Sequence, residues 1–302
     1  MTCLNHASLA ASLAALTVAA DVAAASKPKS PAGKRPAVIV IMTDQQTAGA
    51  MSCAGNPWVE TPAMDALAAD GVRFTRAYCP YPLSGPCRAA LVTGRMPFEV
   101  GAFDNAIRPN DADMRTGIGH RLAEASYECL YAGKWHVPEV NLPDSGTGFR
   151  RISKMNDPAL ADVCDAALKE YDGQKPLFLV ASLLNPHEIC EYGRNETLHY
   201  GELAPFSTDE CPNLPANFMP STYAAEALTL EHASSPRYHD TYTYTQDDWR
   251  RYLYAYYRLV ERVDREVGRI VGVLKARGLY DDAAIIFLSD HGDGAAAHGW
   301  NQ

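Results

Sequence analysis

The sequence predicts an α/β fold, in which helices flank a central, mostly parallel β-sheet. Three continuous apolar runs are typical of strands that are buried on both faces of a sheet. They are Val38–Met42, Leu177–Leu184 and Ala283–Leu288. Helical patterns of apolar residues separate the runs, and this alternation favours a parallel sheet with helices on its faces.

Several shorter elements are expected between the first two runs. Pro62–Asp70 is predicted to be a helix, because Thr61 can cap its start and proline suits the first helical position. Two more strands are expected, one at Val72–Ala77 and one at Cys129–Ala132, which leads into a glycine. A helix is expected to start at Arg88–Thr93, and Leu122–Ala125 is expected to be helical.

The C-terminal half contains the clearest helix, Asp247–Arg277. Its apolar side chains recur at helical spacing and predict a packing face. They are Leu253, Tyr256, Tyr257, Val260, Val263, Val267, Ile270, Val271 and Leu274. The preceding segment, Cys190–Thr245, is rich in Pro, Thr, Tyr and Asn and has weak periodicity. We expect loops there that shape a substrate pocket.

Residues 1–25 are expected to be a signal peptide, which implies export to the periplasm or the extracellular medium of a bacterium. Ala7–Ala20 is apolar but too short to anchor the chain in a bilayer, and Ala23–Ala25 offers a small-residue cleavage site. A disordered, alanine-rich leader is the alternative. Residues 26–36 are expected to be a Pro/Lys-rich linker to one domain, 37–302. No later segment reaches about 18 uninterrupted apolar residues, so no stable membrane anchor is expected.

Composition excludes some classes of function. The net charge of −9 makes the chain a poor candidate for binding nucleic acid, which requires basic surface. A small anionic substrate is still compatible, because a pocket can be locally basic. The eight cysteines include no CxxC pair, so a zinc site is not expected. Most are expected to be buried thiols, with Cys190 and Cys211 as a possible disulfide in an oxidising compartment.

Acidic residues follow the first and the last predicted strands. Asp44 and Gln45 come directly after Val38–Met42, while Asp290 and His291 follow Ala283–Leu288. In an open parallel sheet, ligands bind at the carboxyl ends of the strands. Two carboxylates with amide or imidazole neighbours suit a hard divalent cation. Taken alone, each aspartate is more simply explained as a cap of a turn or helix, so the pair is the more specific signal.

A predicted anion site lies between these two strands. Ser84 stands at the mouth of a predicted helix, and Arg88 follows one turn later. Helix amide groups and a guanidinium would then face one point. The alternative is a serine cap beside a solvated arginine.

The segment Ser84–Arg95 (SGPCRAALVTGR) resembles the signature of type I, formylglycine-dependent sulfatases of the alkaline phosphatase superfamily. That signature is a Cys or Ser followed by any residue, Pro, a small residue and Arg, and then Thr-Gly-Arg. Other elements of this family are matched in the same order: Asp44, Gly133–His136, Asn185–His187, Asp290–Gly292 and Ala297–Gly299. The resemblance spans Pro36–Gln302 and implies an alkaline-phosphatase/sulfatase-like sandwich and the hydrolysis of a sulfate ester.

The resemblance also implies catalytic roles. Ser84 would be oxidised to formylglycine by a separate maturase of the anaerobic type, and the hydrated aldehyde would attack sulfur. His136 would assist deprotonation, and His187 would protonate the leaving oxygen. Lys134 and Arg88 would neutralise charge around the sulfate and the nucleophile.

A bound divalent metal is implied as well, and it is calcium in most of the family. Its ligands would be Asp44, Asp290, His291 and the formylglycine oxygen of residue 84, with Gln45 as a possible addition. Gln45 stands where many members have a second aspartate, and an amide brings no charge. The expected substrate is a sulfated small molecule or glycan, with a carbohydrate sulfate favoured.

Two departures from the family qualify this interpretation. Cys87 stands where serine is common, although its place in the motif argues against a nucleophilic role. The family typically continues beyond the His-Gly element with a further sulfate-binding lysine and a C-terminal subdomain, so 37–302 is expected to be an incomplete catalytic domain of low activity and solubility. The alternatives are a phosphodiesterase or phosphonate monoester hydrolase of the same superfold, and an inactive truncated remnant.

Overall fold

The computed structural model describes residues 35–107, 109–137, 144–234 and 241–301. The predicted signal peptide and nearly all of the predicted linker lie outside these residues. Within them, a five-stranded sheet has the order β3-β2-β4-β1-β5, and all of its neighbouring strands are parallel. The strands are β1 Val38–Asp44, β2 Glu128–Gly133, β3 Arg150–Arg151, β4 Leu177–Pro186 and β5 Ala284–Ser289. The predicted α/β fold with a parallel sheet is confirmed.

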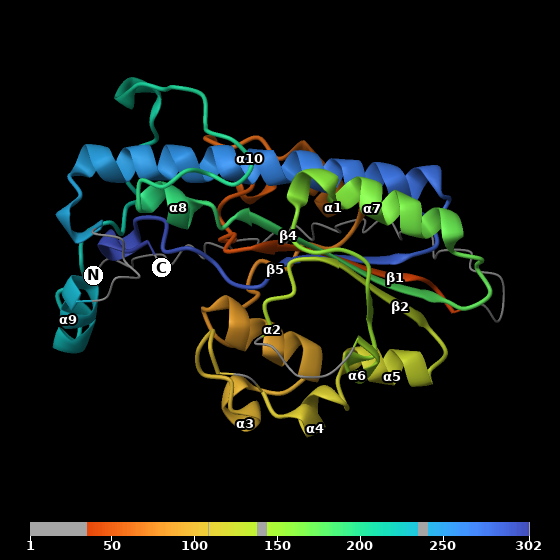
Figure 1. Ribbon diagram of the computed structural model, residues 1–302. Helices are drawn as coiled ribbons and strands as arrows, with labels where there is room; N and C mark the ends of the chain where they lie inside the picture. The colour runs from red at the N-terminus through yellow and green to blue at the C-terminus, as the bar shows by residue number, and fades with distance from the viewer. Residues whose placement is uncertain (1–34, 108, 138–143, 235–240, 302) are drawn as a thin grey trace, which may run out of the picture.

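Helices cover both faces of the sheet (Figure 1). One face carries α1 Pro62–Asp70, α7 Asp157–Glu170 and the long α10 Gln246–Ala276, while α2 Ser84–Thr93 and α5 Ile118–Glu124 lie on the other. Shorter helices complete the described chain. They are α3 Pro97–Val100, α4 Asp111–Met114, α6 Asp144–Thr147, α8 Ile189–Gly193 and α9 Glu226–Ser234, with 3-10 turns at Ser52–Ala54, Thr208–Glu210, Thr241–Thr243 and Ala297–Gly299.

The alternation of side chains along each strand divides the core between the two faces. Ile39 and Ile41 of β1 pack with α1, α7 and α10, whereas Met42 joins the aromatic cluster of the opposite face. The predicted packing face of α10 is buried almost throughout, with Tyr257 and Val271 at its margin. β4 is the central strand and is buried at every position, so its C-terminal end lies at the middle of the sheet edge.

The prediction of a strand at Val72–Ala77 is wrong. This segment is irregular, and the side chains of Val72 and Phe74 are 81% and 79% exposed. Its β-branched and aromatic residues fit a pleated surface, but strand formation requires a neighbouring strand, and none of the described strands pairs with it. β5 also differs from expectation, because it is only partly buried and Ile286 is 47% exposed. Among the described residues β5 pairs with β1 alone, so it forms an edge of the sheet.

Two local expectations also need correction. Cys190 and Cys211 are both buried and form no disulfide with each other, so the suggested pairing is wrong. Thr61 precedes α1 without capping it through its side chain. The cap comes instead from α10, where the carboxylate of Asp264 accepts the N–H groups of Ala63 and Met64 at 3.1 and 2.9 Å.

In its described residues, the expected loop region, 190–245, contains the short helices α8 and α9 and the 3-10 turns Thr208–Glu210 and Thr241–Thr243 among irregular segments. None of the helices described is both long and apolar enough to cross a membrane.

Candidate active site

The carboxyl ends of β1 and β5 and the first residue of α2 meet at one buried point. Asp44 is the last residue of β1, Asp290 and His291 follow β5 directly, and Ser84 is the first residue of α2. All four side chains are buried. The structure therefore brings together the two acidic strand ends and the motif serine, which lie 40 to 246 residues apart in the sequence.

Three acceptor atoms form a corner around Ser84, namely Oδ1 of Asp44, Oδ1 of Asp290 and Nε2 of His291. His291 Nε2 lies 3.9 Å from Oδ1 of Asp44 and 3.9 Å from Oδ1 of Asp290, and these groups are close enough together to hold a metal ion. The Ser84 hydroxyl is 2.9 Å from His291 Nε2 and 3.1 Å from each carboxylate oxygen of Asp44. His291 Nδ1 donates to the carbonyl of Gly292 at 2.8 Å, which leaves the lone pair on Nε2 facing the corner.

The other oxygen of each carboxylate is held by a cation. Arg88, which is 1% exposed, places Nη2 2.7 Å from Asp44 Oδ2 and Nε 2.7 Å from Asp290 Oδ2. Lys134 Nζ lies 2.7 Å from the same Asp44 Oδ2. Arg88 Nη1 also donates to the Lys134 carbonyl and to Ser182 Oγ, both at 2.8 Å. Arg88 is thus an internal ion-pair partner, and the alternative of a solvated arginine does not apply.

The environment shifts the pKa values of the two carboxyl groups in opposite directions. Burial alone would raise the pKa of Asp44, but the nearby charges of Lys134 and Arg88 outweigh it and hold that pKa well below its ordinary value. The pKa of Asp290 is raised, first by burial and then by the charge of Asp44.

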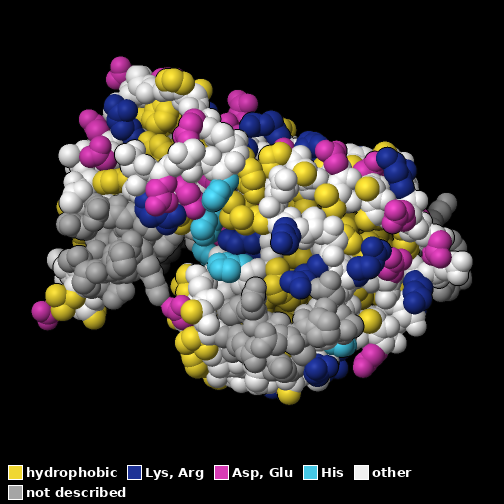
Figure 2. Space-filling model, in the orientation of Figure 1, with side chains coloured by type: hydrophobic (Ala, Val, Ile, Leu, Met, Phe, Trp, Pro, Cys, Tyr) yellow, Lys and Arg dark blue, Asp and Glu magenta, His cyan; other side chains and the backbone are white. Residues whose placement is uncertain are grey.

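His136 and His187 follow β2 and β4 and complete the set at the strand ends. Burial, assisted by the charge of Lys134, lowers the pKa of His136 to about 4 and that of His187 to about 3. Both rings are therefore neutral at pH 7 in the free protein. Figure 2 shows histidine side chains gathered beside basic side chains in a recess of the surface.

Gln45 enters the site mainly through its main chain. Its N–H donates to Asp290 Oδ1 at 3.2 Å, while its side-chain amide donates to Asp293 Oδ2 at 2.8 Å and accepts from Cys190 Sγ at 3.4 Å. Metal ligation by Gln45 stays a prediction, and it would require the side-chain oxygen to leave Cys190. The Cys87 thiol donates to the carbonyl of Asp290 at 2.7 Å, and burial raises its pKa, so it remains protonated.

Several supporting residues were missed by the sequence analysis. The hydroxyl of Tyr252 donates to Asp293 at 2.9 Å, and that of Tyr256 donates to the Gln45 carbonyl at 2.7 Å. Tyr256 belongs to the predicted packing face of α10, where its spacing indicated only burial, and Tyr252 is a further buried residue of the same helix. Ser182, which binds Arg88, lies inside an apolar strand and gave no signal.

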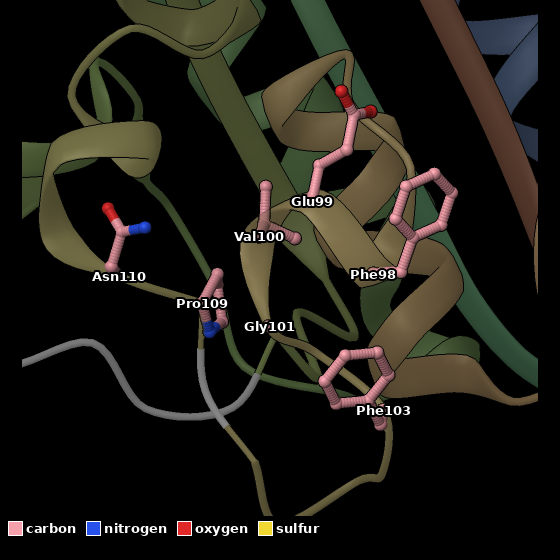
Figure 3. Close-up of a pocket in the computed structure, with 7 residues that line it drawn as sticks. All are labelled: Phe98, Glu99, Val100, Gly101, Phe103, Pro109 and Asn110. Carbon is pink, nitrogen blue, oxygen red and sulfur yellow. The ribbon is translucent and has the colours of Figure 1, made fainter.

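A hollow of ≈ 670 Å³ lies at α3. Phe98 and Phe103 contribute aromatic walls, and Glu99 and Asn110 contribute polar groups (Figure 3). Asn105, from the loop that follows Phe103, accepts the N–H of Gly85 at 2.8 Å. The loop that lines the hollow is therefore tied to the start of α2, next to Ser84.

Comparison with known proteins identifies the family of the chain. A family model described as Sulfatase matches residues 36–301. The Delta 4,5-hexuronate-2-O-sulfatase of Bacteroides thetaiotaomicron is 26% identical over 290 residues, which cover 88% of this chain and 58% of that protein. An ulvan-active sulfatase of Formosa agariphila is 27% identical over 268 residues, which cover 86% of this chain and 51% of that protein.

Solved structures share the fold. A 2-O GAG sulfatase matches with a TM-score of 0.76 at 23% identity, over 89% of this chain and 60% of that one. The phosphonate monoester hydrolase of Agrobacterium radiobacter matches with a TM-score of 0.70 at 22% identity, over 89% of this chain and 65% of that one. This chain thus spans less than two thirds of the length of each of these relatives. Since the family model covers nearly the whole described domain, the chain belongs to the sulfatase family.

Proposed function

We propose that the protein hydrolyses a sulfate ester of a carbohydrate at the site around Ser84. The observation that carries this proposal is the position of Ser84 Oγ, within 3.1 Å of Asp44 and 2.9 Å of His291 at the start of a helix. Relatives are named for the sulfates of hexuronate, N-acetylglucosamine and ulvan, which supports a carbohydrate sulfate as the substrate class.

Ser84 requires conversion to formylglycine in this proposal. An unmodified serine would form a sulfate ester about as stable as the substrate, so it would not turn over. Oxidation removes two protons and two electrons from the Ser84 side chain, and an anaerobic-type maturase is the partner that would accept them. The hydrated aldehyde supplies one hydroxyl that attacks sulfur and a second whose deprotonation expels sulfate and restores the aldehyde.

The residues present fit a divalent cation, with calcium as the proposed ion. Oδ1 of Asp44, Oδ1 of Asp290 and Nε2 of His291 converge, while Arg88 and Lys134 occupy the opposite carboxylate oxygens. Mainly oxygen donors suit calcium, and the hydroxyl oxygen of residue 84 lies beside the same corner. Such an ion would polarise the sulfate oxygens.

The remaining catalytic roles are assigned to charged and neutral side chains of this chain. Lys134 and Arg88 place positive charge around the nucleophile, where negative charge develops during sulfuryl transfer. His136 is neutral at pH 7 and can accept a proton from the attacking group. His187 is also neutral in the free protein, and the negative charge of a bound sulfate ester raises its pKa so that it can carry a proton to the leaving oxygen.

Export and a domain at residues 37–302 remain part of the proposal. The expected signal peptide at residues 1–25 supports a protein that meets its glycan substrate outside the cytoplasm.

A second function, phosphonate monoester hydrolysis, is supported by the fold shared with the Agrobacterium radiobacter enzyme. The two functions differ in the central atom of the ester, so rates on aryl sulfate, aryl phosphate and aryl phosphonate esters separate them.

The proposal is tested by the mass of the peptide that contains Ser84, after co-expression with an anaerobic-type maturase. We expect a peptide lighter by two hydrogens that a hydrazine traps, together with release of sulfate from a sulfated sugar. The Ser84→Ala variant is the matched control and should show neither. An unmodified Ser84, in cells where a control sulfatase is converted, would refute the formylglycine mechanism.

A further inference from the structure

His187 is held by its main chain and not by a hydrogen bond to its ring nitrogen Nδ1. That atom is buried and has no partner within the described part of the chain. The N–H of His187 donates to the carbonyl of Leu184 at 3.1 Å, and its carbonyl accepts the N–H of Cys190 at 3.0 Å. The backbone of residues 184–188 therefore determines where the ring lies.

A buried carboxylate fixes the chain just before His187. Asp157, the first residue of α7, is buried, with an exposed fraction of 3%. Its Oδ1 accepts the N–H of Leu184 at 2.7 Å, and its Oδ2 accepts the N–H of Asn185 at 2.9 Å. Hydrogen bonds to a charged acceptor are among the stronger ones, so α7 holds the end of β4 firmly.

A second buried carboxylate fixes the chain just after His187. Glu188 accepts Asn185 Nδ2 at 2.6 Å and the N–H of Tyr200 at 2.8 Å. Arg262 of α10 donates to the same Glu188 at 3.0 Å and supplies the compensating charge. The residue that follows His187 is thus tied to α10 and to the loop at Tyr200, while α7 and α10 pack side by side over β4 (Figure 1).

We propose that Asp157 and Glu188 are positioning residues that clamp the chain on both sides of His187 and aim its ring at the leaving oxygen of the substrate. This inference rests on the proposed function, in which an N–H bond of protonated His187 breaks and the proton goes to that oxygen. The S–O bond breaks at the same time, and its electron pair stays on the departing oxygen. Both carboxylates act through His187.

The test uses the full chain converted at residue 84 and compares two sulfate esters. An alkyl or sugar sulfate has a poor leaving group that needs the proton, whereas 4-nitrophenyl sulfate has a good leaving group that departs without one. Asp157→Asn keeps one acceptor and turns the other into a donor, which faces an N–H group. We expect this variant to lose roughly 10²-fold in kcat/KM on the alkyl sulfate, with little change on the aryl sulfate.

Matched variants separate positioning from general damage. Asp162→Asn, the same substitution at an exposed position of α7, should behave like the unsubstituted protein on both esters. His187→Ala should show the selective loss, and adding Asp157→Asn to it should cause no further selective loss. Glu188→Gln tests the second clamp independently and is expected to show the same selectivity if Asp157→Asn does not fold.

A loss of equal size on both esters, or no loss on either, in the folded clamp variants would overturn the inference. If His187→Ala is selective and the clamp variants are not, only the positioning role fails. If the unsubstituted protein cleaves neither ester, or if His187→Ala lacks the selectivity, the proposed role of His187 fails and the inference fails with it.

Discussion

Replacing Arg88 with methionine should strongly destabilise the protein. The guanidinium is buried and forms ion pairs with Asp44 and Asp290, each at 2.7 Å. Without it, Asp44 keeps Lys134, whereas Asp290 keeps no lysine or arginine among the ion pairs of the described residues. Removing one partner of a buried ion pair typically costs ~3–5 kcal/mol, because the other charge stays buried without compensation. We expect a loss of this size in the free energy of unfolding.

Urea unfolding at pH 7.5 in EDTA, followed by circular dichroism, measures this loss. Arg95→Met is the matched control, because Arg95 pairs with Asp113 at 2.8 Å but is 53% exposed, and such surface pairs contribute under ~1 kcal/mol. Added calcium should reduce the deficit of the Arg88→Met variant, since a bound cation stabilises the folded state and compensates Asp290. A deficit no larger than that of Arg95→Met would refute the assignment of Arg88 as the central ion-pair partner.

Three further predictions address other parts of the molecule. The pKa of His187 in the folded protein, about 3, lies below its value of about 6.5 in the unfolded chain. Between these pH values the unfolded state binds more protons, so the free energy of unfolding decreases as the pH is lowered. Between pH 8 and pH 5 in EDTA, His187 should thus remove about 2 kcal/mol from the free energy of unfolding, and His187→Gln should lack this part of the decrease. Gly133→Ala should cost more than ~2 kcal/mol in urea unfolding, because φ is 92° and a Cβ would lie 1.9 Å from the Ser182 carbonyl; a neutral effect would show that β2 and β4 are further apart. Asp264→Ala should cost roughly 1–2 kcal/mol by uncapping α1, with Asp247→Ala as the exposed control, and equal melting temperatures would contradict the cap.

The central strands and the long helix were predictable because burial imposes a simple pattern on them. β1 and β4 are apolar at successive positions, since both faces are covered, and α10 repeats its apolar side chains every three or four residues. Val72–Ala77 has a comparable composition but lies exposed. The composition of Val72–Ala77 is suitable for a strand, but a strand forms only where another strand, often distant in the sequence, pairs with it.

The sequence predicted which residues come together at the candidate site, but it did not predict which of their atoms contact one another. The order of the motifs placed Asp44, Ser84 and Asp290 at one edge of the sheet. No pattern indicates that Oδ2 of each aspartate is held by Arg88 while Oδ1 faces His291, because this division depends on rotamers. Asp157 gave no functional signal, since an aspartate in the first turn of a helix is common for local reasons.

The charges of the cluster explain why cations and carboxylates occur together in it. Asp44 and Asp290 are paired with Arg88 and Lys134, and His136 and His187 are neutral at pH 7. Ion pairing of this kind avoids the larger desolvation penalty of an unpaired buried ion. The same ion pairs weaken the attraction of Arg88 and Lys134 for a sulfate anion. A divalent cation at the corner of Asp44, Asp290 and His291 would add positive charge to the cluster, which links substrate binding to metal loading.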